Sequence, residues 1–382
     1  MTTAPLSVLH LSGRPAWCGE SNRVLVLCRG LRDRGATVSL GAPAASALAQ
    51  RAAAEGIPVE SRFRFVRGFR PGPFLADVRA LRRLQRERAF DVVHLHTARD
   101  TWPAAIAFGA RTRGRRPALL RTRHHSLPSG SDPAHRWLYG RVLDHVVLAA
   151  DALREPVAGL FRAGALDDRR VTTIHSAIDP RRFDPSRVSG ADVRREFGIG
   201  DRFCIGLVGR LSREKGHDLL LRALPDILRA EPRAVCLFAG TGDQEERLRE
   251  EVARMGLADH VVFAGFRDDI PECIAAMDVL VVPSLSLEAS PAVVKEGMAM
   301  NRPVIASDVG GVSEILRHGI DGWVIPPGEM SALRDALVRL VRDPATRMAA
   351  GKEARTRIVE RFSDARLVDQ TLALYRRLVE RP

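Results

Sequence analysis

Short apolar segments with the pattern of buried strands alternate with helical segments along the chain, and this alternation restricts the fold more than any other feature. In the first half the predicted strands are 6–11, 37–40, 91–95, 118–122, 145–148 and 171–174. From Phe203 a second series begins, with predicted strands 204–208, 234–238, 260–263, 279–282, 303–306 and 322–325. Because strands that alternate with helices pair in parallel, the sequence predicts an α/β fold whose sheets are covered on both faces.

The length of 382 residues is too great for one ordinary hydrophobic core. The proline-punctuated turn 171–185 lies between the two strand series and is the predicted junction. We therefore expect a first domain at 1–180 and a second at 181–362. The remaining segment, 363–382, has an amphipathic pattern and is expected to form a helix that packs back on the first domain.

The composition is that of a globular protein, with 45% apolar residues and no apolar run long enough to cross a bilayer. Residues 1–4 lead directly into the first predicted strand, without the charged and then apolar pattern of a signal peptide. The five cysteines are scattered singly. Several of them lie inside apolar runs and are predicted to be buried thiols. The set indicates a reducing cytoplasm rather than a disulfide framework or a zinc site.

The formal charge of +13 is compatible with nucleic acid, an anionic membrane face or phosphorylated small molecules as partners. Segment 61–74 interleaves four phenylalanines with four arginines and precedes an arginine-rich helical segment, 76–90. Exposed aromatic rings among cations suit a membrane interface, so we expect peripheral contact with an anionic membrane. The alternative is a strand with buried phenylalanines followed by a solvated helix. No recognised nucleic-acid-binding motif accompanies the charge, and we expect no nucleic-acid partner.

Histidines gather where two neighbouring strands of the first half end. His94 and His96 are two residues apart and therefore face the same side of their strand, while His124 and His125 follow the next strand. The pair could suggest a metal, but no third ligand is apparent nearby. The sequence therefore predicts structural or substrate-positioning histidines and no metal.

The loops of the second half carry the residues suited to an anionic ligand. Arg210 and Lys215 follow the first strand of that series between Gly209 and Gly216, where two cations can neutralise a diphosphate and the glycines permit close backbone approach. Two more such loops follow the next strands, at 240–242 and 265–267. All of them fall on one edge of the predicted sheet, which favours a bound nucleoside diphosphate over an ordinary basic loop.

The segment 281–316 adds a helix start at the same edge. Ser290 and Pro291 form an N-cap and first-turn pair, and the free N–H groups of residues 290–293 are suited to a phosphate. Glu288 and Glu296 bracket this start but lie too far apart for an acid/base dyad, since the helix from Ser290 to Glu296 rises by roughly 9 Å. They predict one extended ligand, with a sugar at Glu288 and a ribose diol at Glu296. The alternative is a capped surface helix with two solvated acids.

The order of these motifs resembles a known family. The segments GRLSREKG, AGTG, VVFAGF, DVLVVPS, EASPAVVKEGMA, PVIASDVGGVSEIL and DGWVIPPG follow one another as they do in the family-four retaining glycosyltransferases. The resemblance implies the GT-B architecture, in which two Rossmann-like domains face each other across a cleft. It also implies transfer of a sugar from a nucleoside-diphosphate sugar to a saccharide or lipid-linked acceptor, with no metal and no cofactor beyond this co-substrate.

The same resemblance implies roles for individual residues. Arg210 and Lys215 match the cations that bind the donor diphosphate, Glu288 the residue beside the donor sugar, and Glu296 the ribose ligand. His124 matches the histidine near the reacting sugar, with His125 as a close rival. The further donor-binding positions are Gly19, Gly240, Phe266, Arg267, Ser290, Pro291, Ala292 and Val293.

Some positions depart from the family pattern. Gly297 replaces an alanine, and Asn301 replaces a glycine at a position that Asn tolerates because it can adopt the left-handed conformation. Ser290 and Pro291 replace a more glycine-rich loop, which leaves the donor sugar open. Segments 94–102 and 121–126 resemble a bacterial subgroup of lipopolysaccharide core and surface-polysaccharide enzymes. The expected function is therefore retaining sugar transfer in cell-envelope glycan synthesis, and the alternative is a nucleotide-sugar epimerase or a phosphorylase on the same fold.

Overall fold

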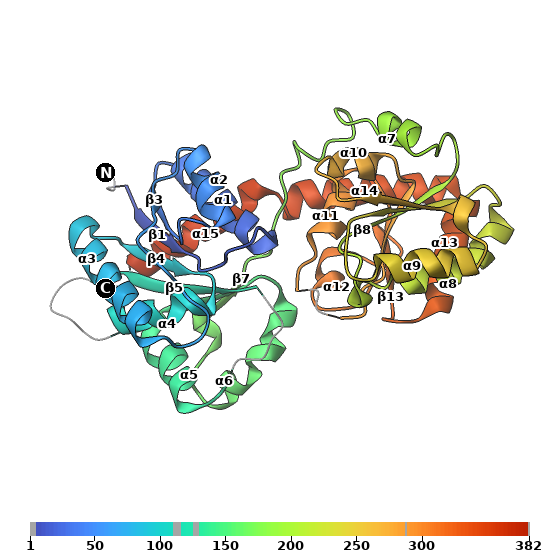
Figure 1. The fold of residues 1–382 in the computed structure, drawn as a ribbon. Helices are drawn as coiled ribbons and strands as arrows, with labels where there is room; N and C mark the ends of the chain where they lie inside the picture. Colours follow the sequence, from blue (N-terminus) through green and yellow to red (C-terminus); the bar gives the residue numbers. More distant parts are fainter. Residues whose placement is uncertain (1–4, 110–115, 125–129, 287–288, 381–382) are drawn as a thin grey trace. The chain divides into compact units, whose positions relative to one another are not determined.

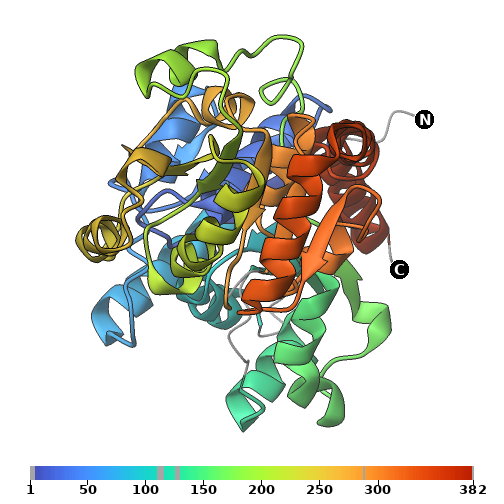
Figure 2. The same ribbon diagram turned by 90° about the vertical axis from the view of Figure 1, so that its right-hand side faces the viewer.

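The computed structural model describes residues 5–109, 116–124, 130–286 and 289–380. The chain forms two compact units, one of residues 1–176 with 364–382 and the other of residues 177–363. The sequence analysis placed these boundaries after residues 180 and 362. Each unit is a parallel sheet with helices against it (Figure 1, and turned in Figure 2).

The first unit contains a seven-stranded sheet in the order β3-β2-β1-β4-β5-β6-β7, and every pairing is parallel. The strands are β1 (Ser7–Leu11), β2 (Thr37–Gly41), β3 (Val59–Glu60), β4 (Val92–Leu95), β5 (Ala118–Arg123), β6 (His145–Leu148) and β7 (Val171–Thr173). The helices are α1 (Gly19–Arg32), α2 (Ala47–Ala54), α3 (Pro71–Arg88), α4 (Ala98–Phe108), α5 (Pro133–Trp137), α6 (Ala158–Arg162) and α15 (Asp364–Val379). Among these strands, the sequence analysis did not predict the two-residue edge strand β3, because so short a segment has no detectable hydrophobic periodicity.

The helix α1 begins at Gly19, only a short segment after the end of β1 at Leu11. Glu20 lies in the first turn, where a carboxylate is favourable beside the positive end of the helix dipole. The serine hydroxyl of Ser21 donates to the carbonyl of Ala16, which ties the start of the helix to the preceding turn.

The second unit contains a six-stranded parallel sheet in the order β10-β9-β8-β11-β12-β13. Its strands are β8 (Cys204–Val208), β9 (Val235–Ala239), β10 (Val261–Gly265), β11 (Val279–Val282), β12 (Val304–Ser307) and β13 (Gly322–Ile325). Its helices are α7 (Ala191–Glu196), α8 (His217–Ala230), α9 (Glu245–Arg254), α10 (Ile270–Ala275), α11 (Ala292–Ala299), α12 (Val312–Ile315), α13 (Met330–Arg342) and α14 (Pro344–Arg361). Successive strand residues such as Cys204 and Ile205 enter different apolar clusters, so the sheet is buried on both faces.

The last helix, α15, belongs to the first unit and packs against α1. The contact is close, because a Cβ added at Gly30 would lie 2.4 Å from a methyl group of Val368. Arg34 and Asp369 form an ion pair of 2.6 Å at its rim. Across the described parts of the chain, no helix combines the length and the apolar character needed to cross a membrane.

The aromatic and basic segment 61–74 differs from the expected row of exposed rings. Phe63 and Phe65 are buried and stack on each other at a centroid distance of 5.0 Å. The carboxylate of Asp77 accepts from the backbone N–H groups of Arg64 and Phe65, which holds this part of the segment against α3. Of the four phenylalanines, Phe69 is the one that stays largely exposed.

Candidate active site

Four loops meet at the carboxyl edge of the second sheet. Backbone hydrogen bonds join the loop after β8 to the loops after β9 and β11: Gly209 N donates to Ala239 O at 3.0 Å, and Leu285 N donates to Glu214 O at 2.8 Å. Another bond, from Gly240 N to Gly265 O at 2.8 Å, joins the loops after β9 and β10. The loops that the sequence analysis placed on one edge are therefore in direct contact, at the edge where open α/β sheets bind ligands.

Gly240 shows why this loop junction needs glycine. Its φ is +150°, and a Cβ at this position would lie 1.9 Å from the carbonyl oxygen of Gly209. A side chain would separate the β9 loop from the loop that carries Arg210 and Lys215. The role of Gly240 is thus to permit close packing of the loops after β8 and β9, and its contact with a donor stays a prediction.

The two predicted cations differ in their surroundings. Arg210 is 68% exposed at its side chain and pairs with Glu214 at 2.7 Å. A backbone hydrogen bond, followed by the bond from Arg210, lowers the pKa of Glu214 to about 2, so the pair is ionised at neutral pH. Lys215 is half-buried at the end of the short turn Arg213–Lys215. Both therefore flank the loop junction, with Lys215 the more enclosed of the two.

The helix α11 begins at Ala292 with Pro291 as its N-cap, rather than with Ser290 in that position. The hydroxyl and the carbonyl oxygen of Ser290 instead accept from Lys295 Nζ, at 3.0 and 3.2 Å. This interaction draws Ser290 away from the helix N-terminus, which explains the difference from the predicted cap. Glu288 lies outside the described residues, so its predicted place beside the donor sugar is not described by the structure.

Lys295 is a residue of this site that the sequence analysis missed. Its side chain is fully buried in α11, although charged side chains are seldom buried without partners. The bonds to Ser290 provide polar partners and fix the loop immediately before the helix. The available signal was a lysine that directly follows the apolar residues Ala292, Val293 and Val294 of a helical segment.

Glu296 is half-buried on the same helix. Burial raises the pKa of its carboxyl to about 7, against the opposing charges of Arg182 and Lys295. The group therefore titrates near neutrality, and its ionised form offers both carboxylate oxygens as acceptors to a ribose diol.

The remaining predicted donor-binding residues occupy different surroundings. Phe266 is 72% exposed, which leaves its ring available for stacking. Arg267 is instead held by two carboxylates, Asp269 and Glu196, each with a bond of 2.7 Å. Its guanidinium thus anchors the loop that presents Phe266. In the first unit, Gly19 is the first residue of α1 and has open space where a side chain would be.

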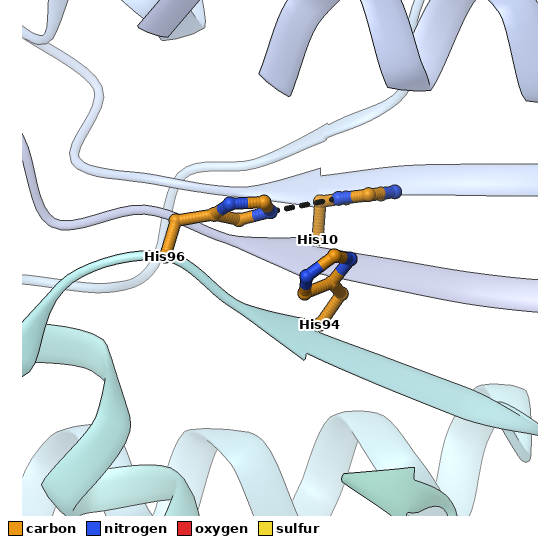
Figure 3. A group of neighbouring side chains, drawn as sticks. All are labelled: His10, His94 and His96. Atoms are coloured by element: carbon orange, nitrogen blue, oxygen red, sulfur yellow. Dashed lines mark hydrogen bonds between the residues drawn. The ribbon is translucent and has the colours of Figure 1, made fainter. Parts of the chain in front are cut away.

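Three histidines form a buried cluster in the first unit (Figure 3). His10 lies opposite His94 in the β1–β4 pairing, and the rings of His94 and His96 stack at a centroid distance of 4.3 Å. His10 Nδ1 lies 3.0 Å from His96 Nε2, and His94 Nε2 lies 2.7 Å from the hydroxyl of Thr122. His10 is the third histidine that the sequence analysis did not find, because the pairing of β1 with β4 brings together residues 84 positions apart.

The cluster is explained by hydrogen bonding. The phenol of Tyr375 in α15 bonds His94 Nδ1 and approaches His10 Nε2, while His96 Nδ1 bonds His124 Nε2 at 3.2 Å. Each ring nitrogen of the three histidines therefore has a hydrogen-bond partner. Burial lowers the pKa of His10 to about 3. Burial also lowers the pKa values of His94 and His96, and the positive charge of neighbouring groups, including Arg23, adds to this effect. The positive charge of the nearby Arg23 guanidinium opposes a divalent cation at this cluster.

The network ends at His124, the predicted residue beside the reacting sugar. His124 is half-buried and follows β5, so the bond to His96 orients its ring from inside the unit. A neutral imidazole donates from one nitrogen and accepts at the other, and the chain of bonds therefore couples the tautomer of His124 to that of the buried rings. His125 lies outside the described residues, so the choice between the two histidines stays open.

Comparison with known proteins places this arrangement in a family. The model "Glycosyltransferase Family 4" matches residues 18–182, and the model "Glycosyl transferases group 1" matches residues 191–357. The GDP-mannose-dependent alpha-(1-6)-phosphatidylinositol monomannoside mannosyltransferase of Mycobacterium tuberculosis is 31% identical over 297 residues, which are 74% of this chain and 75% of that relative. The chain belongs to glycosyltransferase family 4.

Other comparisons give the same result for this glycosyltransferase. An uncharacterised glycosyltransferase of Methanocaldococcus jannaschii is 30% identical over 240 residues, which are 62% of this chain but only 60% of that relative. A glycosyltransferase structure from Rickettsia africae superimposes with a TM-score of 0.88 over the full length of both chains at 18% identity. Anabaena HepE, crystallised with UDP, gives a TM-score of 0.80 at 24% identity over 98% of this chain and 100% of that one. These structures establish the GT-B fold.

Proposed function

We propose that this glycosyltransferase moves a sugar from a nucleoside-diphosphate sugar to a hydroxyl of a saccharide or lipid-linked acceptor, with retention of the anomeric configuration, in cell-envelope glycan synthesis. The observation that carries the proposal is the junction of four loops at the carboxyl edge of the second sheet, where Arg210, Lys215 and the start of α11 lie on contacting segments. A diphosphate fits such a place because cations and free backbone N–H groups both favour anions.

The relatives support the two substrate classes. The mycobacterial relative is named for GDP-mannose as donor and for phosphatidylinositol monomannoside, a lipid-linked saccharide, as acceptor. HepE was crystallised with UDP and with UDP-glucose. A nucleoside diphosphate is common to these donors, and the base and sugar are left for experiment to decide.

In the proposed reaction the bond between the anomeric carbon and the diphosphate oxygen breaks, and its electron pair leaves with the diphosphate. The acceptor oxygen forms the new bond on the same face of the sugar, and its proton passes to the departing phosphate. Arg210 and Lys215 would stabilise the negative charge that develops on the leaving group, a contribution that is often the largest in catalysis. Glu288 and His124 would position the sugar and would not form a covalent intermediate.

The first test is a panel of nucleotide sugars, screened by thermal unfolding and then by release of the nucleoside diphosphate. A ligand that binds only the folded protein raises Tm. At a free ligand concentration of a hundred times Kd, the folded state is stabilised by about 2.7 kcal/mol. We expect nucleotides of one base to stabilise the protein and one of their sugars to be consumed. If no member of the panel raises Tm or is consumed, the donor class proposed here is wrong.

Nucleotide affinity should depend on pH through Glu296. Because burial raises the pKa of this carboxyl to about 7, the ionised ribose-binding form is scarce at pH 6 and dominant at pH 8. A single group that must be ionised then gives about tenfold tighter nucleoside-diphosphate binding at pH 8 than at pH 6, measured by calorimetry. Glu296→Gln should bind more weakly at pH 8 and lose this pH dependence, whereas an unchanged profile in the variant would remove Glu296 from the ribose site.

We also propose that the protein is cytoplasmic and meets an anionic membrane peripherally through the exposed part of segment 61–74. Phe69 is 75% exposed and is flanked by the exposed Arg67 and Arg70, an arrangement suited to the headgroup layer. Phe69→Ser should lower partition onto phosphatidylglycerol vesicles by about tenfold, the effect of withdrawing one aromatic ring from lipid. Met348→Ser, which changes a similarly exposed side chain on α14, should leave vesicle binding unchanged. Equal binding by wild type and Phe69→Ser would contradict the proposal.

A further inference from the structure

The first unit contains a second place suited to an anion, in addition to the loops of the second unit that are assigned to the donor diphosphate. A pocket of about 280 Å³ lies at the carboxyl edge of its sheet, and its lining includes His124. The charged side chains in the lining are four arginines and one glutamate: Arg14, Arg99, Arg121, Arg123 and Glu20. With neutral histidines these groups sum to +4 − 1, a net charge of +3 in a space large enough for a small ligand.

Arg121 is the most informative arginine of the pocket because it is buried. Only 7% of the residue is exposed, and its Nη1 donates to the hydroxyl of Tyr139 at 2.9 Å. Its Nε has no hydrogen-bond partner among the residues that the structure describes. A buried guanidinium with an unsatisfied donor is costly unless an anion completes its bonding.

Arg123 strengthens the case because it lies two residues from Arg121 on β5 and therefore faces the same side. Both side chains line the pocket. Burial lowers the pKa of Arg123, and the like charge of Arg121 adds to the effect. Two cations held near each other in a partly buried pocket repel, and a shared anion between them would remove that repulsion.

The carboxylates near the pocket are already engaged. Glu20 pairs with Arg14 at 3.1 Å. Asp100 is buried and accepts from the backbone N–H groups of Gly13, His96 and Thr97 at the start of α4. Burial raises the pKa of Asp100 to about 7, so this carboxyl is only partly ionised at neutral pH. Asp100 also interacts electrostatically with Arg121. The lining of the pocket nevertheless holds more arginines than carboxylates.

We propose that this pocket binds a phosphoryl group carried by the acceptor. The inference rests on the proposed function, in which the loops of the second unit bind the donor diphosphate. The anion site beside His124 in the first unit would then bind the acceptor. A phosphate monoester supplies up to two negative charges and three acceptor oxygens, and guanidinium groups bind such a group in a bidentate manner. The substrate class is thus a phosphorylated saccharide or a phosphate-containing lipid-linked saccharide.

The test is calorimetric titration of the full chain with inorganic phosphate, glycerol 3-phosphate and glucose 6-phosphate, beside glycerol and glucose as neutral controls. We expect at least one phosphate probe to bind and the neutral probes not to bind. Arg123→Gln and Arg121→Gln should each weaken probe binding by at least about tenfold, the loss expected for a charge-assisted hydrogen bond. Arg79→Gln, which alters an exposed arginine of α3, is the matched control and should bind as wild type does. Arg123→Gln keeps the test usable if the more buried Arg121→Gln does not fold.

A second arm separates the two sources of phosphate. Saturating UDP or GDP should leave probe binding intact if the pocket serves the acceptor, and should abolish it if the pocket receives the phosphate of the donor. The proposal is overturned if no phosphate probe binds, if the arginine variants bind the probes as wild type does, or if nucleotide displaces them. Nucleotide-dependent stabilisation, measured separately, shows whether the donor function survives such a result.

Discussion

Replacing Lys215 by alanine is expected to lower kcat by about two to three orders of magnitude, the loss typical of removing one group that stabilises developing negative charge. The lysine is half-buried at the end of the turn Arg213–Lys215, in the loop that contacts the segments after β9 and β11. Its ammonium would compensate charge on the departing diphosphate, which is greater in the transition state than in the bound donor. The measurement is steady-state release of nucleoside diphosphate from whichever nucleotide sugar the thermal screen identifies.

Two controls make the result specific. Lys215→Arg keeps the charge and should recover part of the rate, although the guanidinium differs in shape from an ammonium. Lys352→Ala removes an exposed lysine of α14 and should leave both rate and Tm unchanged. A Lys215→Ala variant with wild-type turnover and an unchanged Tm would exclude the lysine from the reaction and require a different assignment for the β8 loop.

Gly216→Ala should cause a large loss of stability. Gly216 has φ +73° and is the N-cap of α8, and a Cβ there would lie 2.1 Å from the carbonyl oxygen of Pro283. The left-handed backbone costs an alanine about 1 kcal/mol, and overpacking against a backbone atom adds about 1–3 kcal/mol. A domain of this size should then lose roughly 4–16 °C in Tm. Turnover should fall as well, because Lys215 is the preceding residue.

Gly256→Ala provides a matched control for this substitution. Gly256 has φ +67°, nearly the same backbone conformation, but no atom lies within 4 Å of the added Cβ. This variant should therefore show only the backbone cost of about 1 kcal/mol, with full activity. If the two variants lose the same stability, the close approach of the β8 loop to Pro283 is not a constraint.

The strands of both sheets could be predicted closely because their apolar runs are short and bounded by polar residues. Four of them, β6, β8, β11 and β13, have the predicted bounds. Asn301 adopts φ +56°, the left-handed conformation anticipated where the family has glycine. The start of α11 could not be predicted as well, because the bonds from Lys295 to Ser290 compete with capping, and a side chain five residues away is not visible in a local pattern.

Features that depend on contacts between distant segments could not be predicted from the sequence. The 61–74 segment has one pattern of alternating phenylalanine and arginine, but Phe63 and Phe65 are buried while Phe69 stays exposed. The partners of Arg267 were likewise hidden, since Glu196 lies 71 residues away. Hydrophobic periodicity indicates which face of one element is buried, and it says nothing about which other element covers that face.

The sequence by itself determined the α/β class, the order of strands along the chain, and the family-four motifs of the second unit, because these are set by local periodicity and by residues adjacent in the chain. The tertiary structure alone decided that His10, the β4 histidines and Tyr375 of α15 form one hydrogen-bonded network, and that Arg121 is buried in a basic pocket. The physical reason is that hydrogen bonds and desolvation act between atoms in space. Segments from opposite ends of the chain can share an environment that neither of them encodes alone.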